Sequence, residues 1–159
     1  GNLYKELEPT RYDRDDPLNP VLMMLGNAFE DRFEKVLAWN GVTVERPGEF
    51  LSPEGIAYSP DLVVFNGVTR VGEMKLTSMS LDSIPDEPSY GLPPKFSKFA
   101  CQIMLYAYWL DVFDGWLILC SIREPWKPIL RILDLHWKEQ ELQENHTMCM
   151  NFGKQRGLV

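Results

Sequence analysis

A hairpin between residues 61 and 76 constrains the fold of this chain more than any other feature. Residues 61–65 read Asp-Leu-Val-Val-Phe, residues 68–76 read Val-Thr-Arg-Val-Gly-Glu-Met-Lys-Leu, and Asn66-Gly67 stands between them. Asn-Gly is favoured in two-residue hairpin turns because both positions need a positive φ. Valine-rich segments on either side favour strands. The sequence therefore predicts two antiparallel strands joined at Asn66-Gly67.

Two amphipathic helices flank this hairpin in the sequence. Apolar residues recur every three or four positions from about residue 20 to Trp39, and again from Phe96 to Val112. That spacing gathers apolar side chains on one face of a helix. Asn40-Gly41 is a typical C-terminal stop for the first helix.

The remaining segments complete an α/β pattern. We expect a short strand over residues 42–46, two apolar strands over residues 116–122 and 128–135, and a last helix that begins at His136 and ends near Met150. Residues 78–95 hold Ser, Pro and Gly without periodicity, which predicts a long loop. The order indicates a central mixed β-sheet flanked by helices. We expect an irregular arm over residues 1–20 and a single domain over residues 21–159.

Composition excludes several classes of protein. The three cysteines are dispersed, which favours reduced thiols in a cytoplasmic protein over a disulfide framework, a zinc site or an iron–sulfur cluster. No apolar run approaches the ~18 residues that span a bilayer, and nothing marks the chain for secretion. The net charge of −7 opposes a simple electrostatic DNA-binding protein. That objection weakens if some of the acids bind cations.

The hairpin also carries the residues best suited to chemistry. Asp61 opens its first strand, and Glu73 and Lys75 lie two positions apart on its second strand, so they point to the same face. Two carboxylates can converge on a hard divalent cation, and the Met74 carbonyl offers a further oxygen ligand. A lysine beside a cation can have its pKa lowered enough to handle a proton. Taken singly, Asp61 is also compatible with a simple turn residue. Glu73 and Lys75 are likewise compatible with a solvated strand edge.

Pro60-Asp61 followed by Glu73-Met74-Lys75 resembles the motif of the PD-(D/E)XK nuclease superfamily. The order helix, three strands, helix, strand is also that of its restriction-endonuclease-like core. Gly26 to Glu30, in the helix before the motif, is similar to a segment in which these nucleases carry a metal-facing acid. Gln102 and Tyr106, in the helix after it, resemble the QxxxY helix of the RecB-like and lambda-exonuclease-like branch. The resemblance covers roughly residues 22–135.

This resemblance implies a role for each matched residue. Asp61, Glu73 and the Met74 carbonyl would bind one Mg²⁺ or Mn²⁺ ion, and Glu30 would reach a second ion or its water shell. Lys75 would orient the attacking water or stabilise the charged transition state. A further pair, Gln102 and Tyr106, would position the site and contact the nucleic acid.

Alternatives stay open for several of these residues. Glu34 lies one helical turn after Glu30, so either can be the inward acid, and both can be surface acids. Gln102 can be a surface residue, and Tyr106 can simply fill the core. Lys95 and Lys98 can meet phosphates or form a solvated helix start.

The function expected from the resemblance is hydrolysis of DNA phosphodiesters, by an exonuclease of phage or recombination-repair type. A structure-specific or restriction-like endonuclease is the alternative enzyme, and a catalytically silent nucleic-acid-binding module is the alternative outside enzymes. DNA is the expected partner, with a homo-oligomer or a recombination or replication protein as further partners. We expect residues 78–95 to become ordered over the substrate. Strand polarity, DNA against RNA and single- against double-stranded substrate stay open.

Overall fold

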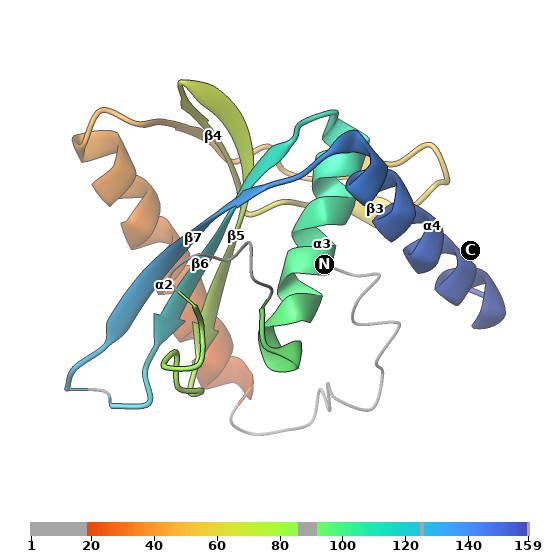
Figure 1. The fold of residues 1–159 in the computed structure, drawn as a ribbon. Helices are drawn as coiled ribbons and strands as arrows, with labels where there is room; N and C mark the ends of the chain where they lie inside the picture. The colour runs from red at the N-terminus through yellow and green to blue at the C-terminus, as the bar shows by residue number, and fades with distance from the viewer. Residues whose placement is uncertain (1–18, 86–91, 125, 159) are drawn as a thin grey trace.

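A five-stranded mixed sheet forms the centre of the fold in the computed structural model (Figure 1), which describes residues 19–85, 92–124 and 126–158. The predicted arm over residues 1–20 lies outside this range except for its last two residues. Neighbours in the sheet run in the order β1 (Thr43–Glu45), β4 (Leu62–Asn66), β5 (Val68–Thr77), β6 (Asp114–Ser121) and β7 (Ile129–His136). Only β5 and β6 pair in parallel. The expected mixed sheet flanked by helices is confirmed.

The predicted hairpin is formed by β4 and β5. Gly67 has φ of 75°, in the left-handed region that glycine tolerates, and the strands pair antiparallel on either side of it. Pairing with β4 stops at Leu62 opposite Gly72, whereas β5 continues to Thr77 beside β6. Among the described strands, none pairs with residues 73–77 on the β4 side. The segment that carries the candidate residues thus lies along an open edge.

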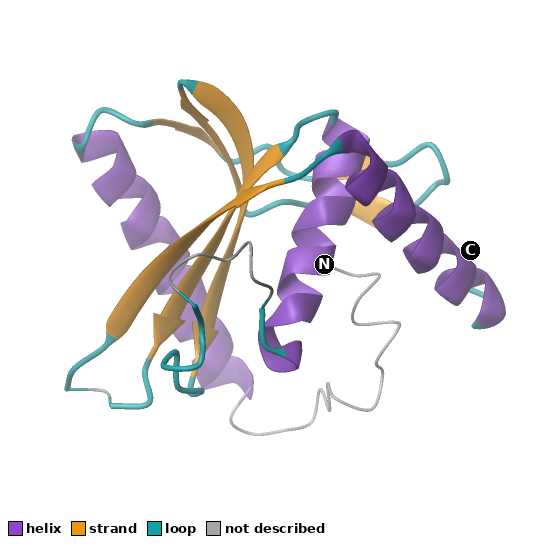
Figure 2. Cartoon of the chain, in the orientation of Figure 1, coloured by secondary structure: helices purple, strands orange, loops and turns teal. Residues whose placement is uncertain are grey.

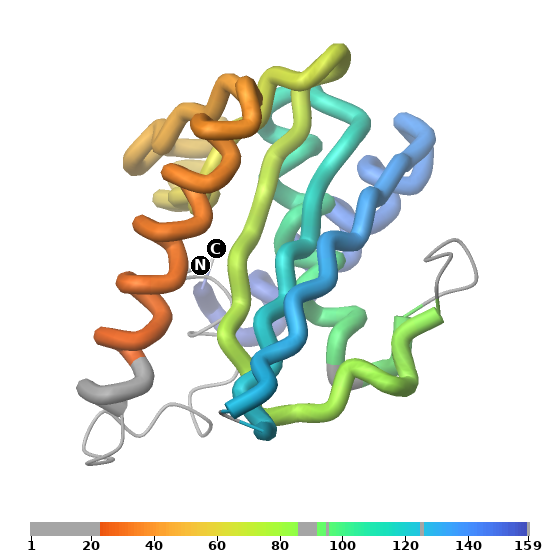
Figure 3. Tube along the Cα trace, turned by 90° about the vertical axis from the view of Figure 1, so that its left-hand side faces the viewer, coloured from red at the N-terminus to blue at the C-terminus, as the bar shows by residue number. Residues whose placement is uncertain are grey.

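Helices lie on both sides of the sheet, as the chain trace in Figure 3 shows from the side. On one side, α2 (Asn19–Trp39) buries Phe33 and Leu37 against Leu62, Val64 and the Met74 side chain. On the other side, α3 (Pro94–Leu110) packs against β5 and β6 through a larger core. Alternate strand residues point to opposite faces, so Met74 faces α2 while Glu73 and Lys75 face α3.

The core under α3 is continuous from the sheet to the last helix. Phe96 and Ile103 of α3 are fully buried, as are Leu117 and Leu119 of β6. Truncating a buried phenylalanine such as Phe96 to alanine typically costs about 3–5 kcal/mol. This packing fixes the face of α3 that looks toward Glu73.

Both ends of α3 differ slightly from the prediction. It begins at Pro94, two residues before the expected start at Phe96, and ends at Leu110. Pro93, the residue before the helix, is extended, with ψ of 147°. Pro94 is tolerated in the first turn because the backbone N–H that proline lacks would have no helical partner there. Asp111 ends the helix in the left-handed conformation, with φ of 55°.

The prediction that His136 begins the last helix is wrong. His136 is the final residue of β7, opposite Asp114, and α4 (Glu139–Gln155) begins three residues later. The strand is prolonged because the Trp137 N–H donates to the Phe113 carbonyl at 2.9 Å. Glu141 then accepts from the backbone N–H that precedes the helix.

A small second sheet was not predicted. Its strands, β2 (Phe50–Leu51) and β3 (Ala57–Tyr58), are two residues each, too short to show an alternating pattern. In the small sheet, the Phe50 ring stacks on the Tyr58 ring. The Tyr58 ring stacks in turn on that of Tyr106 of α3, with 5.6 Å between the two ring centres.

Figure 2 shows helices, strands and loops in the view of Figure 1. No helix in the described part of the chain is long and apolar enough to cross a membrane. Cys101, Cys120 and Cys149 are all free thiols.

Candidate active site

Asp61 lies at the open edge of β5, directly before β4. Its Oδ2 accepts a hydrogen bond of 2.7 Å from the Met74 backbone N–H. That N–H lies two residues beyond Gly72, where the pairing with β4 ends. The Asp61 side chain therefore takes the place of a strand partner, which holds its carboxylate against β5.

Glu73 and Lys75 share the opposite face of the strand from Met74. Glu73 is only 2% exposed, and its Oε2 lies 3.2 Å from the Lys75 Nζ. The other oxygen, Oε1, is buried and has no hydrogen-bond partner among the described residues. A buried carboxylate oxygen without a partner costs free energy, which makes it a position suited to a missing donor or cation.

The Asp61 carboxylate acts electrostatically on two acids of other segments, Glu73 of β5 and Glu30 of α2. Burial, and then the nearby Asp61 carboxylate, raise the pKa of Glu73 to about 8, although Lys75 opposes this rise. Burial and Asp61 also raise the pKa of Glu30 to about 7, against the effects of Arg46 and Lys75. Asp61 thus lies close enough to Glu30 of α2 and to Glu73 of β5 to affect the pKa of each, and Lys75 pairs with Glu73.

Gln102 and Tyr106 face this group from α3. Both are buried, and the Gln102 Nε2 donates to the Tyr106 hydroxyl oxygen at 2.7 Å. Burial, and then the charge of Glu73, raise the pKa of the Tyr106 phenol well above its usual range. The two side chains therefore form a hydrogen-bonded pair next to Glu73, not a surface residue and a separate core residue.

Glu30 and Glu34, left as alternatives by the sequence, both bind the same arginine. Arg46 Nη2 lies 3.2 Å from Glu30, and its Nε lies 3.2 Å from Glu34. The charges of Asp61 and Lys75 both affect the pKa of Glu30. Arg46 was not among the predicted site residues. The available signal was its position two residues after Val44, on the face that looks toward α2.

A cleft of about 490 Å³ opens between α2 and the start of β4. Its lining combines residues of α2 with residues of the two loops on either side of the small sheet: Asn27, Glu30, Asp31, Arg46, Gly48, Ser59, Pro60 and Asp61. The predicted acids Glu30 and Asp61 therefore share one solvent-accessible hollow.

The site differs from a fully assembled side-chain metal cage. Within the described part of the chain, no three His, Cys, Asp or Glu side chains converge closely enough to form one. The donors that are present, carboxylate oxygens of Asp61 and Glu73 with one Glu73 oxygen unpaired, are those that Mg²⁺ and Mn²⁺ prefer. These cations commonly take few protein ligands and keep several waters. The residues present therefore fit such an ion.

The two predicted phosphate contacts lie at the start of α3. The Lys98 ammonium lies 5.5 Å from the centre of the Phe99 ring, and the Lys75 ammonium lies at the same distance from that ring. The side chain of Lys95 lies outside the described residues, as do residues 86–91 of the predicted loop. The described start of that loop is attached to the sheet through Arg131, which donates to the Ile84 and Pro85 carbonyls.

No protein-family profile matches this chain, and a comparison with curated protein sequences gives no match. Two solved structures are similar in overall chain path. The crystal structure of SSO0001 has 21% sequence identity, a TM-score of 0.47, and an alignment over 92% of this chain and 66% of that one. The structure of LHK-Exo in complex with dAMP has 16% identity, a TM-score of 0.49, and covers 85% of this chain and 68% of that one. The chain thus spans about two thirds of the length of each.

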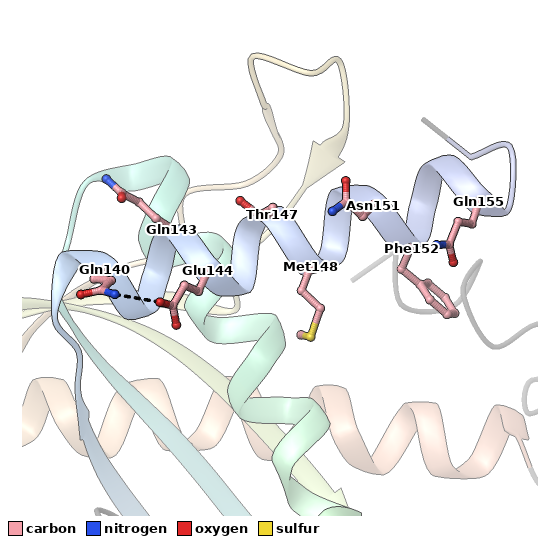
Figure 4. A pocket seen from close by; sticks show the side chains of 8 residues that line it. All are labelled: Gln140, Gln143, Glu144, Thr147, Met148, Asn151, Phe152 and Gln155. Atoms are coloured by element: carbon pink, nitrogen blue, oxygen red, sulfur yellow. Dashed lines mark hydrogen bonds between the residues drawn. The ribbon is translucent and has the colours of Figure 1, made fainter.

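A second hollow, of about 780 Å³, lies along the outer side of α4 (Figure 4). Its lining is mostly amide and apolar, and its one ionisable residue, Glu144, accepts a hydrogen bond from Gln140 at 2.9 Å. It contains neither a pair of carboxylates nor a nucleophile with a base. The cleft beside Asp61 is therefore the better candidate for catalysis.

Proposed function

We propose that this chain is a Mg²⁺- or Mn²⁺-dependent nuclease that hydrolyses DNA phosphodiesters. One observation carries the proposal: among the described residues, no group donates to the buried Glu73 Oε1, which lies beside Lys75 and next to the Asp61 carboxyl at an open strand edge. A fold keeps such a costly group when a ligand completes it. The resemblance to the PD-(D/E)XK motif supports the same assignment.

Asp61 and Glu73 hold the principal metal ion in this proposal. A third ligand, the Met74 carbonyl, follows from strand geometry, since the N–H and C=O of one strand residue point to the same side. The Met74 N–H points to Asp61, so its carbonyl faces the same open edge. An ion held there would polarise the phosphate and lower the pKa of a water molecule that it binds.

Lys75 orients the attacking water and donates to the phosphate as negative charge develops. Its ammonium is held by Glu73 at 3.2 Å and lies over the Phe99 ring, so the group is positioned before substrate arrives. Glu30, coupled to both Asp61 and Lys75, binds a second ion or its water shell.

The buried pair of Gln102 and Tyr106 positions Glu73 from α3 and contacts the end of the substrate, while Lys98 and Lys95 contact phosphates. A preference for exonuclease action at DNA ends rests on the resemblance of this pair to the QxxxY helix. Recombination, repair or phage replication is the setting in which such an activity fits.

A cleavage assay on end-labelled linear, nicked and closed circular DNA, with Mg²⁺ or Mn²⁺, tests this function. We expect linear DNA to be degraded from its ends, and Lys75→Ala to abolish the activity. Lys35→Ala is the matched control, since Lys35 is an exposed residue of α2. Cutting of closed circles would indicate an endonuclease.

A catalytically silent binding module is the second candidate, favoured by the absence of a three-residue ligand cage among the described residues. It predicts DNA binding without cleavage in either metal. Activity that survived Lys75→Ala would place the active site elsewhere.

A further inference from the structure

Arg46 is the one described residue in the cleft that opposes its negative charge. It immediately follows β1, and each of its three side-chain nitrogens pairs with a different carboxylate of α2. Nη1 lies 2.6 Å from Asp31, Nη2 lies 3.2 Å from Glu30, and Nε lies 3.2 Å from Glu34. A guanidinium presents its donors in a planar fork, so it can hold several acids at once.

The local fold explains why the guanidinium lies here. Val44 packs against the core under α2, and alternation along the strand sends Arg46 to the same side. Glu45 pairs with Val63, so Arg46 continues past the end of this ladder toward the start of β4, where Asp61 lies. Arg46 thus reaches α2 and the Asp61 cleft together.

The arrangement places a fixed positive charge beside an acid assigned to metal binding. Glu30 and Asp61 line one cleft and repel each other, which favours any cation between them. Arg46 supplies such a positive charge, and it contacts Glu30 through its Nη2 atom alone. Its other two contacts, to Asp31 and Glu34, do not depend on Glu30.

We propose that Arg46 is a resident counter-cation, which yields Glu30 to a divalent ion and then donates its freed Nη2 to a phosphate oxygen of the substrate. This inference rests on the proposed function. Asp31 and Glu34 keep the guanidinium in place during the exchange, so only one of its donors changes partner. Arg46 is a competitor of the metal and a ligand of the substrate.

These two roles give opposite effects when the charge is removed. Arg46→Gln should bind Mn²⁺ about two- to fivefold more tightly than wild type, since a partly exposed ion pair contributes up to about 1 kcal/mol. The same variant should bind a short DNA duplex about tenfold more weakly, because a charge-assisted phosphate contact is lost. A purely structural arginine would not separate the two affinities in this way.

The experiment is a Mn²⁺ titration followed by electron paramagnetic resonance, with DNA affinity measured separately by fluorescence anisotropy in Ca²⁺ after gels confirm that the duplex stays intact. Arg32→Gln is the matched control, because it also removes one arginine charge but does so outside the cleft. The Arg32 guanidinium belongs to α2 and lies over the Trp39 ring. Arg46→Lys is the second variant if Arg46→Gln does not fold; a single ammonium cannot hold three carboxylates, so it should also bind Mn²⁺ more tightly.

Tighter Mn²⁺ binding with weaker DNA binding, and neither change in Arg32→Gln, supports the proposal. Unchanged or weaker Mn²⁺ binding by the Arg46 variants overturns it, and so does unchanged DNA affinity. A wild-type protein that binds no Mn²⁺ at all overturns the proposed function instead. The two failures are therefore distinguishable.

Discussion

Replacing Glu73 with glutamine should stabilise the metal-free protein, although it removes a residue assigned to catalysis. Glutamine has the shape of a protonated glutamate and carries no charge. The Glu73 carboxyl is almost fully buried, and its pKa is raised from 4.5 to about 8 in the folded state. Ionising this carboxyl therefore costs free energy in the folded protein but not in the unfolded chain, so ionisation lowers the free energy of unfolding.

The sign and size of this effect follow from the two pKa values. Below pH 4.5 the group is protonated in both states and costs nothing. Between pH 4.5 and about 8 the unfolded chain ionises first, so wild type loses up to about 1.4 kcal/mol per pH unit relative to Glu73→Gln. Above about pH 8 the difference is constant. Relaxation of the protein and entry of water reduce this stability difference. We therefore expect Glu73→Gln to be more stable than wild type by roughly 2–5 kcal/mol above about pH 8.

Thermal and urea unfolding of both proteins across this pH range, in the presence of a chelator, measures the difference. For a chain of this size, about 2–4 °C per kcal/mol corresponds to a rise in melting temperature on the order of 10 °C at alkaline pH. Glu144→Gln is the control, because that carboxylate lies on an exposed face of α4. A Glu73→Gln variant no more stable than wild type at alkaline pH would refute the reasoning that Glu73 is a buried, costly charge.

Three other substitutions or reactions probe separate parts of the structure. Tyr106→Phe leaves the buried Gln102 Nε2 without its acceptor, so urea unfolding should show a loss of about 1–3 kcal/mol; an unchanged stability would contradict the buried pair. Burial raises the pKa of the Cys149 thiol to about 11, so iodoacetamide should modify it slowly at neutral pH and faster as the pH rises, and rapid labelling in the folded protein would contradict this. Trp126 is 82% exposed, so its ring is accessible for stacking on bases. Trp126→Ala should then weaken single-stranded DNA binding by about 1–3 kcal/mol without changing the melting temperature. Equal affinities of wild type and variant would exclude that role.

The hairpin and the helices could be predicted because their signals are local. Gly67, with its positive φ, forms the turn of the predicted hairpin, and apolar spacing predicts α2 and α3 to within two residues at their ends. The same alternation placed Glu73 and Lys75 on one face. The helical spacing of Gln102 and Tyr106 placed them on one face as well, where they bond to each other.

Features that depend on tertiary contacts were not predictable from local patterns. Arg46 meets its three acids only because β1 and α2 pack together. The depth at which Glu73 is buried depends on α3 covering β5, and His136 continues β7 because its neighbour Trp137 bonds to Phe113. No sequence window contains both partners of these contacts.

The melting temperature of wild type and Glu73→Gln, with and without saturating Mn²⁺, tests most directly whether the buried acids form a metal site. An ion that binds only the folded state stabilises it by RT ln(1 + c/Kd), where c is the free ion concentration, so tighter binding gives a larger rise in melting temperature. We expect Mn²⁺ to raise the melting temperature of wild type near pH 8 and to leave that of Glu73→Gln unchanged. A wild-type melting temperature that does not respond to Mn²⁺, or an equal rise in both proteins, would contradict the account.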